Sequence, residues 1–179
     1  MRASIVVRAA VAADVPAIAA IYAHHVTTGT ASFELTAPTV DEMMRRFEAA
    51  ADGDYPYFVA TDANGHVIGY AYAGAYRARP AYRHTVENSV YVEAGGGGHG
   101  VGSALLAVLV SACADRGFRQ MIAILGGADN VASIALHRAH GFVEAGRLTD
   151  VGRKHDKWLD TVLMQRSLGD GASSPPTRK

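Results

Sequence analysis

The glycine-rich segment from Gly95 to Gly102 constrains this chain more than any other feature of its sequence. It follows the β-branched run Thr85 to Val92, which predicts a strand, and precedes an apolar segment from Ser103 to about Arg116 at helical spacing. Residues without a Cβ atom let an anion approach the unpaired N–H groups at a helix start, where the helix dipole also favours negative charge. This order indicates a site for a phosphate-bearing cofactor, although a glycine run can also be only a flexible connection.

Two common nucleotide-binding motifs do not fit this segment. No Gly-Lys-Ser/Thr follows the glycines, as a P-loop requires. The dinucleotide motif G-x-G-x-x-G needs an acidic residue about 20 residues later, at the end of the next strand, and that residue is missing. ATP and NAD are therefore disfavoured as ligands.

Helices and strands alternate along the rest of the chain. Helix starts are predicted at Asp14, with Pro16 in the first turn, and at Thr39, which fits a T-x-x-E capping box with Glu42. Asn64-Gly65 predicts a tight hairpin turn, because both residues tolerate positive φ. The other predicted elements are strands at Ser4 to Arg8, Tyr57 to Thr61, His66 to Tyr76, Phe118 to Leu125 and Trp158 to Gln165, and a helix at Asn130 to His140 closed by Gly141.

Length and composition indicate one folded domain. The chain has 179 residues, of which 49% are hydrophobic and 19% charged. Residues 1–168 are predicted to form the domain, and the low-complexity segment 169–179 a disordered tail, because it is too polar to offset the entropy of ordering it. The formal net charge of +0 argues against nucleic acid or an anionic membrane as a partner.

Cysteine usage and hydropathy bear on chemistry and location. Cys113 is the single cysteine, so no intramolecular disulfide is possible, and its place among Leu, Val and Ala predicts a buried, inert thiol. No Cys/His cluster has zinc spacing, so no metal is expected. The apolar run Val101 to Ala114 is shorter than the ~20 residues that cross a bilayer, and the N-terminus lacks a signal-peptide core. A cytoplasmic protein is predicted.

Two motifs in the second half of the chain point to a family. Residues 97–102 match the pattern Gln/Arg-x-x-G-x-G/A at both of its glycine positions, Gly100 and Gly102. Gly97 stands where the pattern has Gln or Arg. The pattern N-x-x-S/A-x-x-x-Y/H-x-x-x-G-F is matched by Asn130, Ser133, His137 and Gly141-Phe142. With these motifs the chain resembles the GNAT superfamily of acetyl-CoA-dependent N-acetyltransferases from about residue 5 to 168. The resemblance implies an α+β GNAT acyl-CoA N-acyltransferase fold, a mixed and mostly antiparallel sheet with helices on both faces that opens after Glu87.

Other segments resemble one group within that superfamily. They are residues 30–34 (TASFE), Arg77-x-Arg79 with Tyr82, residues 86–92 (VENSVYV) and residues 152–160 (GRKHDKWLD). They are similar to the phosphinothricin and methionine sulfoximine or sulfone N-acetyltransferases. This resemblance implies direct acetyl transfer from acetyl-CoA, in a ternary complex, to the α-amino group of a small amino-acid-like substrate. It also implies a homodimer.

The chemistry of such a transfer selects candidate catalytic residues. An α-ammonium must lose a proton before its nitrogen attacks the thioester, so a base is required. Glu87 is the candidate, because a carboxylate inside an apolar strand is costly without a task, although strand alternation also allows it to face solvent. A backbone N–H in residues 90–92 is a candidate donor to the developing oxyanion. His137 is a candidate acid or second base, although a helical histidine is more often structural.

The resemblance also assigns binding residues. The cofactor candidates are Val90, Tyr91, Val92, Gly98, His99, Gly100, Val101, Gly102, Ser103, Asn130 and Ser133. Asn130 is equally readable as a plain helix N-cap. The substrate candidates are Arg77 and Arg79, whose guanidinium groups suit a carboxylate, and Phe33 and Tyr82 as pocket walls. Lys154, Asp156 and Lys157 are interpreted as a solvated turn, and the histidines outside the motifs, such as His24, His25 and His140, receive no role.

Two other functions stay open from the sequence. A GNAT enzyme for another amino acid, a polyamine or a protein N-terminus would keep Glu87 and the glycine loop and use Arg77 and Arg79 differently. A non-catalytic acyl-CoA-binding module is the second alternative, because Gly97 replaces the usual Gln or Arg.

Overall fold

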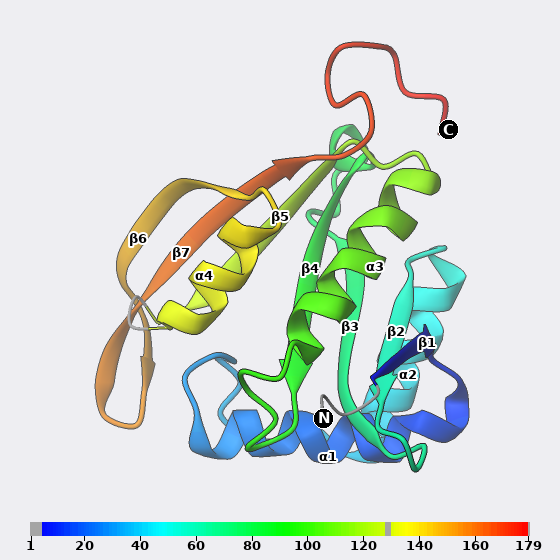
Figure 1. The fold of residues 1–179 in the computed structure, drawn as a ribbon. Coiled ribbons are helices and arrows are strands. Elements are labelled where there is room, and N and C mark those ends of the chain that lie inside the picture. The colour runs from blue at the N-terminus through cyan, green and yellow to red at the C-terminus, as the bar shows by residue number, and fades with distance from the viewer. Residues whose placement is uncertain (1–4, 128–129, 179) are drawn as a thin grey trace.

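A mixed sheet of seven strands organises the chain in the computed structural model, which describes residues 5–127 and 130–178 (Figure 1). The strand order is β1-β2-β3-β4-β5-β7-β6, and every neighbouring pair is antiparallel except β4 and β5. The elements are β1 (Val6–Ala9), α1 (Val15–Thr28), α2 (Val40–Asp52), β2 (Tyr57–Thr61), β3 (Val67–Ala75), β4 (Thr85–Val92), α3 (Val101–Asp115), β5 (Gln120–Gly126), α4 (Val131–Ala139), β6 (Val143–Lys154) and β7 (Lys157–Ser167).

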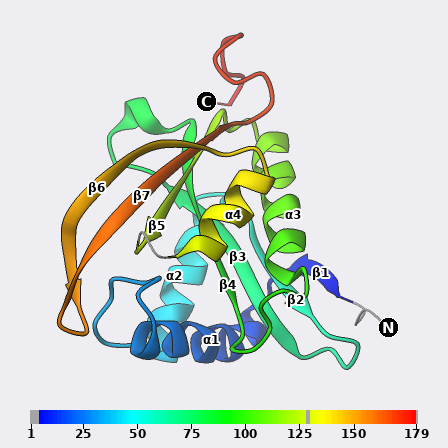
Figure 2. The same ribbon diagram turned by 60° about the vertical axis from the view of Figure 1, so that its left-hand side comes forward.

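Helices cover both faces of the sheet. One core joins α3 to the sheet through Leu105, Leu109 and Val86. The other joins α1 and α2 to the sheet through Ile18, Met43 and Tyr70. Figures 1 and 2 show α3 and α4 together over one face. The predicted α+β class, a mostly antiparallel sheet with helices on both faces, is confirmed. No helix among residues 5–127 and 130–178 is long and apolar enough to span a membrane.

The sheet opens between β4 and β5. These two strands pair only over Thr85–Asn88 and Gln120–Ala123. Beyond that point β4 stays paired with β3 as far as Val92, while β5 stays paired with β7 as far as Gly126. The two halves of the sheet therefore separate toward the C-terminal ends of β4 and β5 (Figure 1), as the family resemblance implied.

Hydrogen-bond alternation shows which backbone groups face this opening. At the two ends of β4, Tyr76 N–H donates to Thr85 O, and Glu93 N–H donates to Ile68 O. In an antiparallel pair of strands, residues that hydrogen-bond to the neighbouring strand alternate with residues whose N–H and C=O groups point away from it. The odd-numbered residues of β4 therefore bond to β3. The N–H and C=O groups of Val90 and Val92 consequently point into the opening, where β5 no longer supplies partners.

Local sequence signals explain most of the elements. The predicted strand Thr85 to Val92 is β4 with the same bounds, and Thr39 caps α2 by accepting from Glu42 N–H. The β2–β3 hairpin is present, but only Gly65 of its turn has positive φ, and the Asp62 carboxylate accepts the N–H groups of the following residues. Asp14 precedes α1 without capping it, because its carboxylate binds Arg8 instead.

Two regions differ from the sequence-based expectation. β6 was not predicted, because its polar, glycine-containing sequence lacks strand alternation and lies exposed at the sheet edge, held by its pairing with β7. Segment 169–179 was predicted to be disordered. In the described part of it, Arg119 donates to Ser174 Oγ and to Pro175 O, and the Arg178 guanidinium stacks on Phe118 at 4.2 Å. Side chains of the domain thus supply the contacts that the tail's own composition lacks.

Candidate active site

A pocket of about 650 Å³ lies where β4 and β5 separate. Ten of the eleven predicted cofactor residues line it; only His99 does not. Residues that the sequence analysis missed line it too, from the end of α1 and the loop after it and from α4. The missed residues include His25, Gly29, Thr30, Ala31, Ala132 and Leu136. Ala132 and Leu136 fall at unspecified positions of the motif that begins at Asn130, whereas His25 and Gly29 reach the pocket only through tertiary packing.

The backbone of β4 forms one wall of the pocket. The amides of Val90 and Val92 face it, whereas the Tyr91 amide belongs to the ladder with Tyr70 of β3. Tyr91, predicted to bind the cofactor, therefore lines the pocket without offering its amide. The His25 Nε2 atom lies 2.8 Å from Val92 O, so this nitrogen carries a proton and donates it.

The glycine segment turns the chain from β4 into α3. Gly98 and Gly100 have φ of +80° and +85°, a region that side chains with a Cβ rarely adopt, and Gly100 is the N-cap residue of α3. A Cβ atom on Gly102 would lie 3.3 Å from the Leu136 side chain of α4, so any larger residue would require that side chain to shift. The first N–H groups of α3 thus remain open to the pocket.

Asn130 stands at the start of α4 on the other side of the pocket. Its Oδ1 atom accepts from Ser133 N–H at 3.3 Å, which is the ordinary N-cap interaction. Because Asn130 also lines the pocket, the cap and a ligand contact are compatible.

Glu87 lies half-buried on the face of β4 opposite α3, where it pairs with Ile122 of β5, one residue before the last paired residue Asn88. Burial raises the pKa of its carboxyl group, and the positive charge of Arg77 opposes that rise. A raised pKa brings the group closer to the range in which it can accept a proton and release it. The alternative that Glu87 is a fully solvated surface residue does not agree with this placement.

The predicted substrate residues are placed unequally. Arg77 influences Glu87 electrostatically and lies over the Tyr76 ring, which Tyr82 also contacts at 5.7 Å between centroids. Arg79, before the short turn Pro80–Tyr82, is exposed, as are Arg77 and Tyr82. Among the described residues, neither arginine has a hydrogen bond or ion pair to Glu87, and Arg77 differs from Arg79 in its electrostatic effect on that carboxyl group.

Phe33 belongs to the loop between α1 and α2, which crosses to the other half of the sheet. A Cβ atom at Gly126 of β5 or Gly152 of β6 would overlap its ring, so both glycines make room for it. Phe33 stays 39% exposed, which leaves part of the ring free to contact a ligand.

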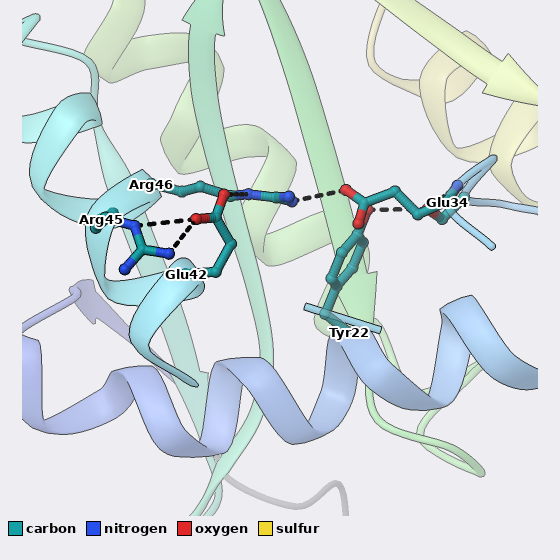
Figure 3. A network of polar contacts seen from close by, with 6 residues as sticks. Tyr22, Glu34, Glu42, Arg45 and Arg46 are labelled. Carbon is teal, nitrogen blue, oxygen red and sulfur yellow. Dashed lines mark hydrogen bonds and ion pairs between the residues drawn. The ribbon is translucent and has the colours of Figure 1, made fainter. Parts of the chain in front are cut away.

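A polar network fixes the same loop against α1 and α2 (Figure 3). Glu34 Oε1 accepts from Arg46 Nη1 of α2 at 2.6 Å and from the Tyr22 hydroxyl of α1 at 3.1 Å. Arg46 also donates to Glu42, and Tyr22 lies 2.9 Å from the buried Ser32 hydroxyl. The loop is therefore held at the residues on both sides of Phe33.

The interpretation of Lys154, Asp156 and Lys157 as a solvated turn is wrong for Lys154. Its side chain is buried, and Nζ donates to Ser32 O at 2.7 Å. Burial lowers the pKa of Lys154, and Glu34 opposes that shift. Lys157 and Asp156 are exposed as expected, whereas Lys154 ties the end of β6 to the α1–α2 loop.

His137 is buried beneath the pocket instead of lining it. Its Nε2 atom lies 2.9 Å from Asn88 Oδ1, its Nδ1 atom lies 2.8 Å from Ser133 O, and its ring packs edge-on against Phe142. Burial lowers the pKa of His137, which favours the neutral ring, and a neutral ring donates a proton to only one of these two acceptor oxygens. Because the ring does not line the pocket, it has no position from which to protonate a leaving group there. The placement supports a structural role and not the predicted acid or base role.

Two other sequence-based expectations concern groups outside the pocket. Cys113 is buried in α3, and burial raises the pKa of its thiol to about 12, so it is not a nucleophile. Within residues 5–127 and 130–178, no three His, Cys, Asp or Glu side chains are grouped as a metal site would require.

Comparison with known proteins identifies the family. Residues 7–163 match the model of the acetyltransferase (GNAT) domain, so the chain belongs to the GNAT acetyltransferase family. It is 51% identical to a phosphinothricin N-acetyltransferase of Alcaligenes faecalis over 91% of this chain and 82% of that protein. It is 40% identical to an L-methionine sulfoximine/L-methionine sulfone acetyltransferase of Pseudomonas paraeruginosa over 94% and 98% of the two chains.

A solved structure resembles the whole chain. It is the phosphinothricin acetyltransferase of Sinorhizobium meliloti in complex with AcCoA, with a TM-score of 0.95, 50% identity, and coverage of 99% of this chain and 94% of that one. The predictions of a GNAT fold, of an acetyltransferase, and of a likeness to the phosphinothricin and methionine sulfoximine enzymes are confirmed.

The buried contacts of His137 lead to a test of stability. His137→Ala leaves Asn88 Oδ1 without its ring partner and opens a cavity beside Phe142. We expect the free energy of unfolding in urea to fall by about 2–4 kcal/mol. A variant as stable as the wild type would contradict the structural role of His137.

Glu87→Gln is the matched control for that measurement. The folded-state pKa of Glu87 is raised, so its ionised form destabilises the fold above the ordinary pKa of a glutamate. The control should be as stable as the wild type or more stable at neutral pH. The wild type should regain stability relative to it as pH falls through the raised pKa.

Proposed function

We propose that this enzyme transfers the acetyl group of acetyl-CoA to the α-amino group of a small amino-acid-like compound of the phosphinothricin, methionine sulfoximine or methionine sulfone type. The observation that carries the proposal is the opening between β4 and β5, with unpaired Val90 and Val92 amides beside a half-buried Glu87. The likeness to enzymes named for these substrates supports it.

The pocket suits an extended, amide-containing molecule that ends in a pyrophosphate. Backbone groups of Val90 and Val92 are placed to bond a chain lying in the position that a further strand would occupy. The open N–H groups at Gly100 and at the first turn of α3 suit phosphate oxygens. Asn130 and Ser133 line the pocket as well and offer polar groups for the amides. Pantetheine joined to a nucleotide diphosphate has this arrangement of groups, so acetyl-CoA is the proposed acetyl donor.

The proposed transfer is direct. Glu87 accepts a proton from the substrate ammonium, directly or through a water, and the free amine then attacks the acetyl carbon. The Val90 N–H donates to the oxygen that becomes negative as the carbon turns tetrahedral. The carbon–sulfur bond then breaks, the nitrogen gives up its second proton, and the departing thiolate takes that proton directly or through water. We assign His137 a positioning role, because it holds Asn88 at the last paired row of β4 and β5, next to Glu87.

Arg77 is the proposed partner for the carboxylate or the tetrahedral group of the substrate. It lies on the Glu87 side, and an arginine fork binds planar or tetrahedral oxyanions with two hydrogen bonds. Phe33 and Tyr82 are each partly exposed and are proposed as walls of the substrate pocket. Arg79 is proposed as a second, weaker contact at the surface.

The proposed base leads to a kinetic prediction. Glu87→Gln keeps the shape of the side chain but accepts no proton, so kcat/KM should fall by about 10²–10⁴. The acidic limb of the pH profile should disappear, while calorimetry should show unchanged acetyl-CoA binding. Turnover close to that of the wild type at neutral pH would remove Glu87 from the mechanism.

Substrate recognition leads to a second kinetic prediction. Arg77→Ala should raise KM for phosphinothricin about ten-fold, a loss of about 1.4 kcal/mol, with a smaller rise for Arg79→Ala and little change for the exposed control Arg83→Ala. Methionine sulfone and its decarboxylated analogue should separate the contribution of the carboxylate. If the decarboxylated compound is acetylated as well as its parent, or if polyamines or peptide N-termini are better substrates, the proposed substrate class is wrong.

We also propose a homodimer that associates through the β6–β7 hairpin and acts in the reducing cytoplasm. Leu148, Val151 and Trp158 of this hairpin are 49%, 54% and 63% exposed, and β6 leaves one edge of the sheet unpaired. A bare strand edge with apolar side chains promotes association with another chain.

The dimer proposal predicts the effect of one charge. Trp158→Glu should shift the mass measured by light scattering from two chains to one, because a buried unpaired carboxylate is costly. Val11→Glu, at a similarly exposed valine (53%) far from the hairpin in sequence, is the control and should stay dimeric. A wild type that is monomeric at micromolar concentration would contradict the proposal.

A further inference from the structure

The proposed pyrophosphate site lacks a strong cation. The ionisable side chains that line the pocket in the described part of the chain belong to His25, Tyr91 and Glu93, with no lysine or arginine among them. Gly97 stands where the GNAT motif has Gln or Arg, and the space around its Cα is open. Backbone N–H groups alone would face two phosphate charges there.

Ser103 and His140 meet at this end of the pocket. Ser103 is the third residue of α3 and lines the pocket, and its Oγ atom lies 2.8 Å from Nε2 of His140, the residue that ends α4. The Arg166 guanidinium of β7 donates to His140 O, which fixes the backbone that carries the ring. The His140 residue is partly buried, and its ring makes this contact at the protein surface.

The direction of this hydrogen bond decides what Ser103 offers a ligand. If Nε2 is unprotonated, Ser103 donates its only proton to the ring and presents lone pairs to the phosphate, which repel it. If Nε2 carries a proton, the ring donates to Oγ, and the hydroxyl proton is free for a phosphate oxygen. A bound phosphate therefore favours the second arrangement.

We propose that His140 is a positioning residue of the cofactor site, which donates Nε2–H to Ser103 so that the Ser103 hydroxyl donates to the pyrophosphate of acetyl-CoA. The pair thus supplies a side-chain donor to the phosphates, which in the GNAT motif would come from the Gln or Arg at the position of Gly97. This inference rests on the pyrophosphate placement proposed above.

Protonation of His140 strengthens the same contact. The charged groups that face the ring are Arg166 from β7 and, when protonated, His137 from α4, while α3 presents the neutral Ser103. Burial and Arg166 lower the pKa of His140, so the neutral Nε2–H form makes the contact at neutral pH. As pH falls, the imidazolium adds a positive charge behind the hydroxyl, and phosphate binding should tighten.

A calorimetric mutant cycle with acetyl-CoA tests the proposal. Ser103→Ala and His140→Ala should each weaken acetyl-CoA binding about five-fold, and the double variant should be no weaker than either single variant, because the two side chains act as one unit. His140→Gln should recover part of the affinity, since its amide can donate to Ser103. The wild type should bind more tightly than His140→Gln by a ratio that grows from pH 7 to pH 5, because the pKa of His140 is lowered from its ordinary value.

Two further arms separate this inference from the function it rests on. Kinetics with S-acetylpantetheine, which has no phosphate, should be unchanged in Ser103→Ala and His140→Ala; this also shows that both variants fold. Gly100→Val should weaken acetyl-CoA binding at least ten-fold, because valine does not tolerate the φ of +85° at that residue. His66→Ala, at an exposed histidine in the β2–β3 turn, is the control for loss of a histidine.

The proposal has distinct failures. If the Ser103→Ala and His140→Ala effects multiply, if either variant leaves acetyl-CoA affinity unchanged, or if S-acetylpantetheine turnover falls equally, the Ser103–His140 pair has no phosphate role. If Gly100→Val also binds acetyl-CoA normally, the pyrophosphate placement itself is wrong. If Gly100→Val loses acetyl-CoA affinity and His140→Ala does not, only this inference is wrong, and the acetyltransferase assignment stays in place.

Discussion

The separation of β4 from β5 after Asn88 is the constraint on which the rest of the structure depends. A strand that loses its neighbour exposes N–H and C=O groups, which are costly unless water, a side chain or a ligand satisfies them. His25 satisfies Val92 O, so the chain itself fills one of these positions. The others remain available at the place where an acetyl donor and an amine must meet. The opening is thus a set of backbone donors and acceptors held ready for a ligand.

An opening in a sheet persists only if the two halves are held at a fixed distance. Asn88 bonds to Ile122 O of β5 and to His137 of α4, which fixes the point where the strands part. On the opposite face the α1–α2 loop spans the halves, with Phe33 against glycines of β5 and β6 and with Ser32 bonded to Lys154. Contacts on both faces of the sheet therefore hold the width of the opening.

The sequence predicted what short-range chemistry determines. The strand Thr85 to Val92, the Thr39 cap and the glycine turn into α3 depend on neighbouring residues, and these predictions agree with the structure. Most of the predicted cofactor residues lie in two contiguous motifs, and all of the predicted set except His99 line the pocket. Glu87 was predicted as the base because a carboxylate contradicts the apolar pattern of its strand and because of the family resemblance, and this role stays a prediction.

Contacts between distant segments were not predictable. Lys154 has the sequence surroundings of a solvated turn, and its burial depends on Ser32, more than a hundred residues away. His137 carries the motif of a reactive residue, but its environment depends on Asn88 of another strand. His25 has no local signal, and β6 has a polar sequence that only its pairing with β7 makes a strand. In each case the partner, and not the residue itself, determines the role.

The glycine segment has a consequence for the energetics of ligand binding. Gly95, Gly96, Gly97 and Gly98 are consecutive, and glycine loses more backbone freedom on ordering than any other residue. A ligand that immobilises this segment therefore meets an entropic penalty, which favourable enthalpy from phosphate hydrogen bonds must exceed. The binding enthalpy would then be larger in magnitude than the free energy of binding, and the affinity would weaken as the temperature rises. For this chain, the temperature of its surroundings becomes a determinant of how fully the pocket is occupied.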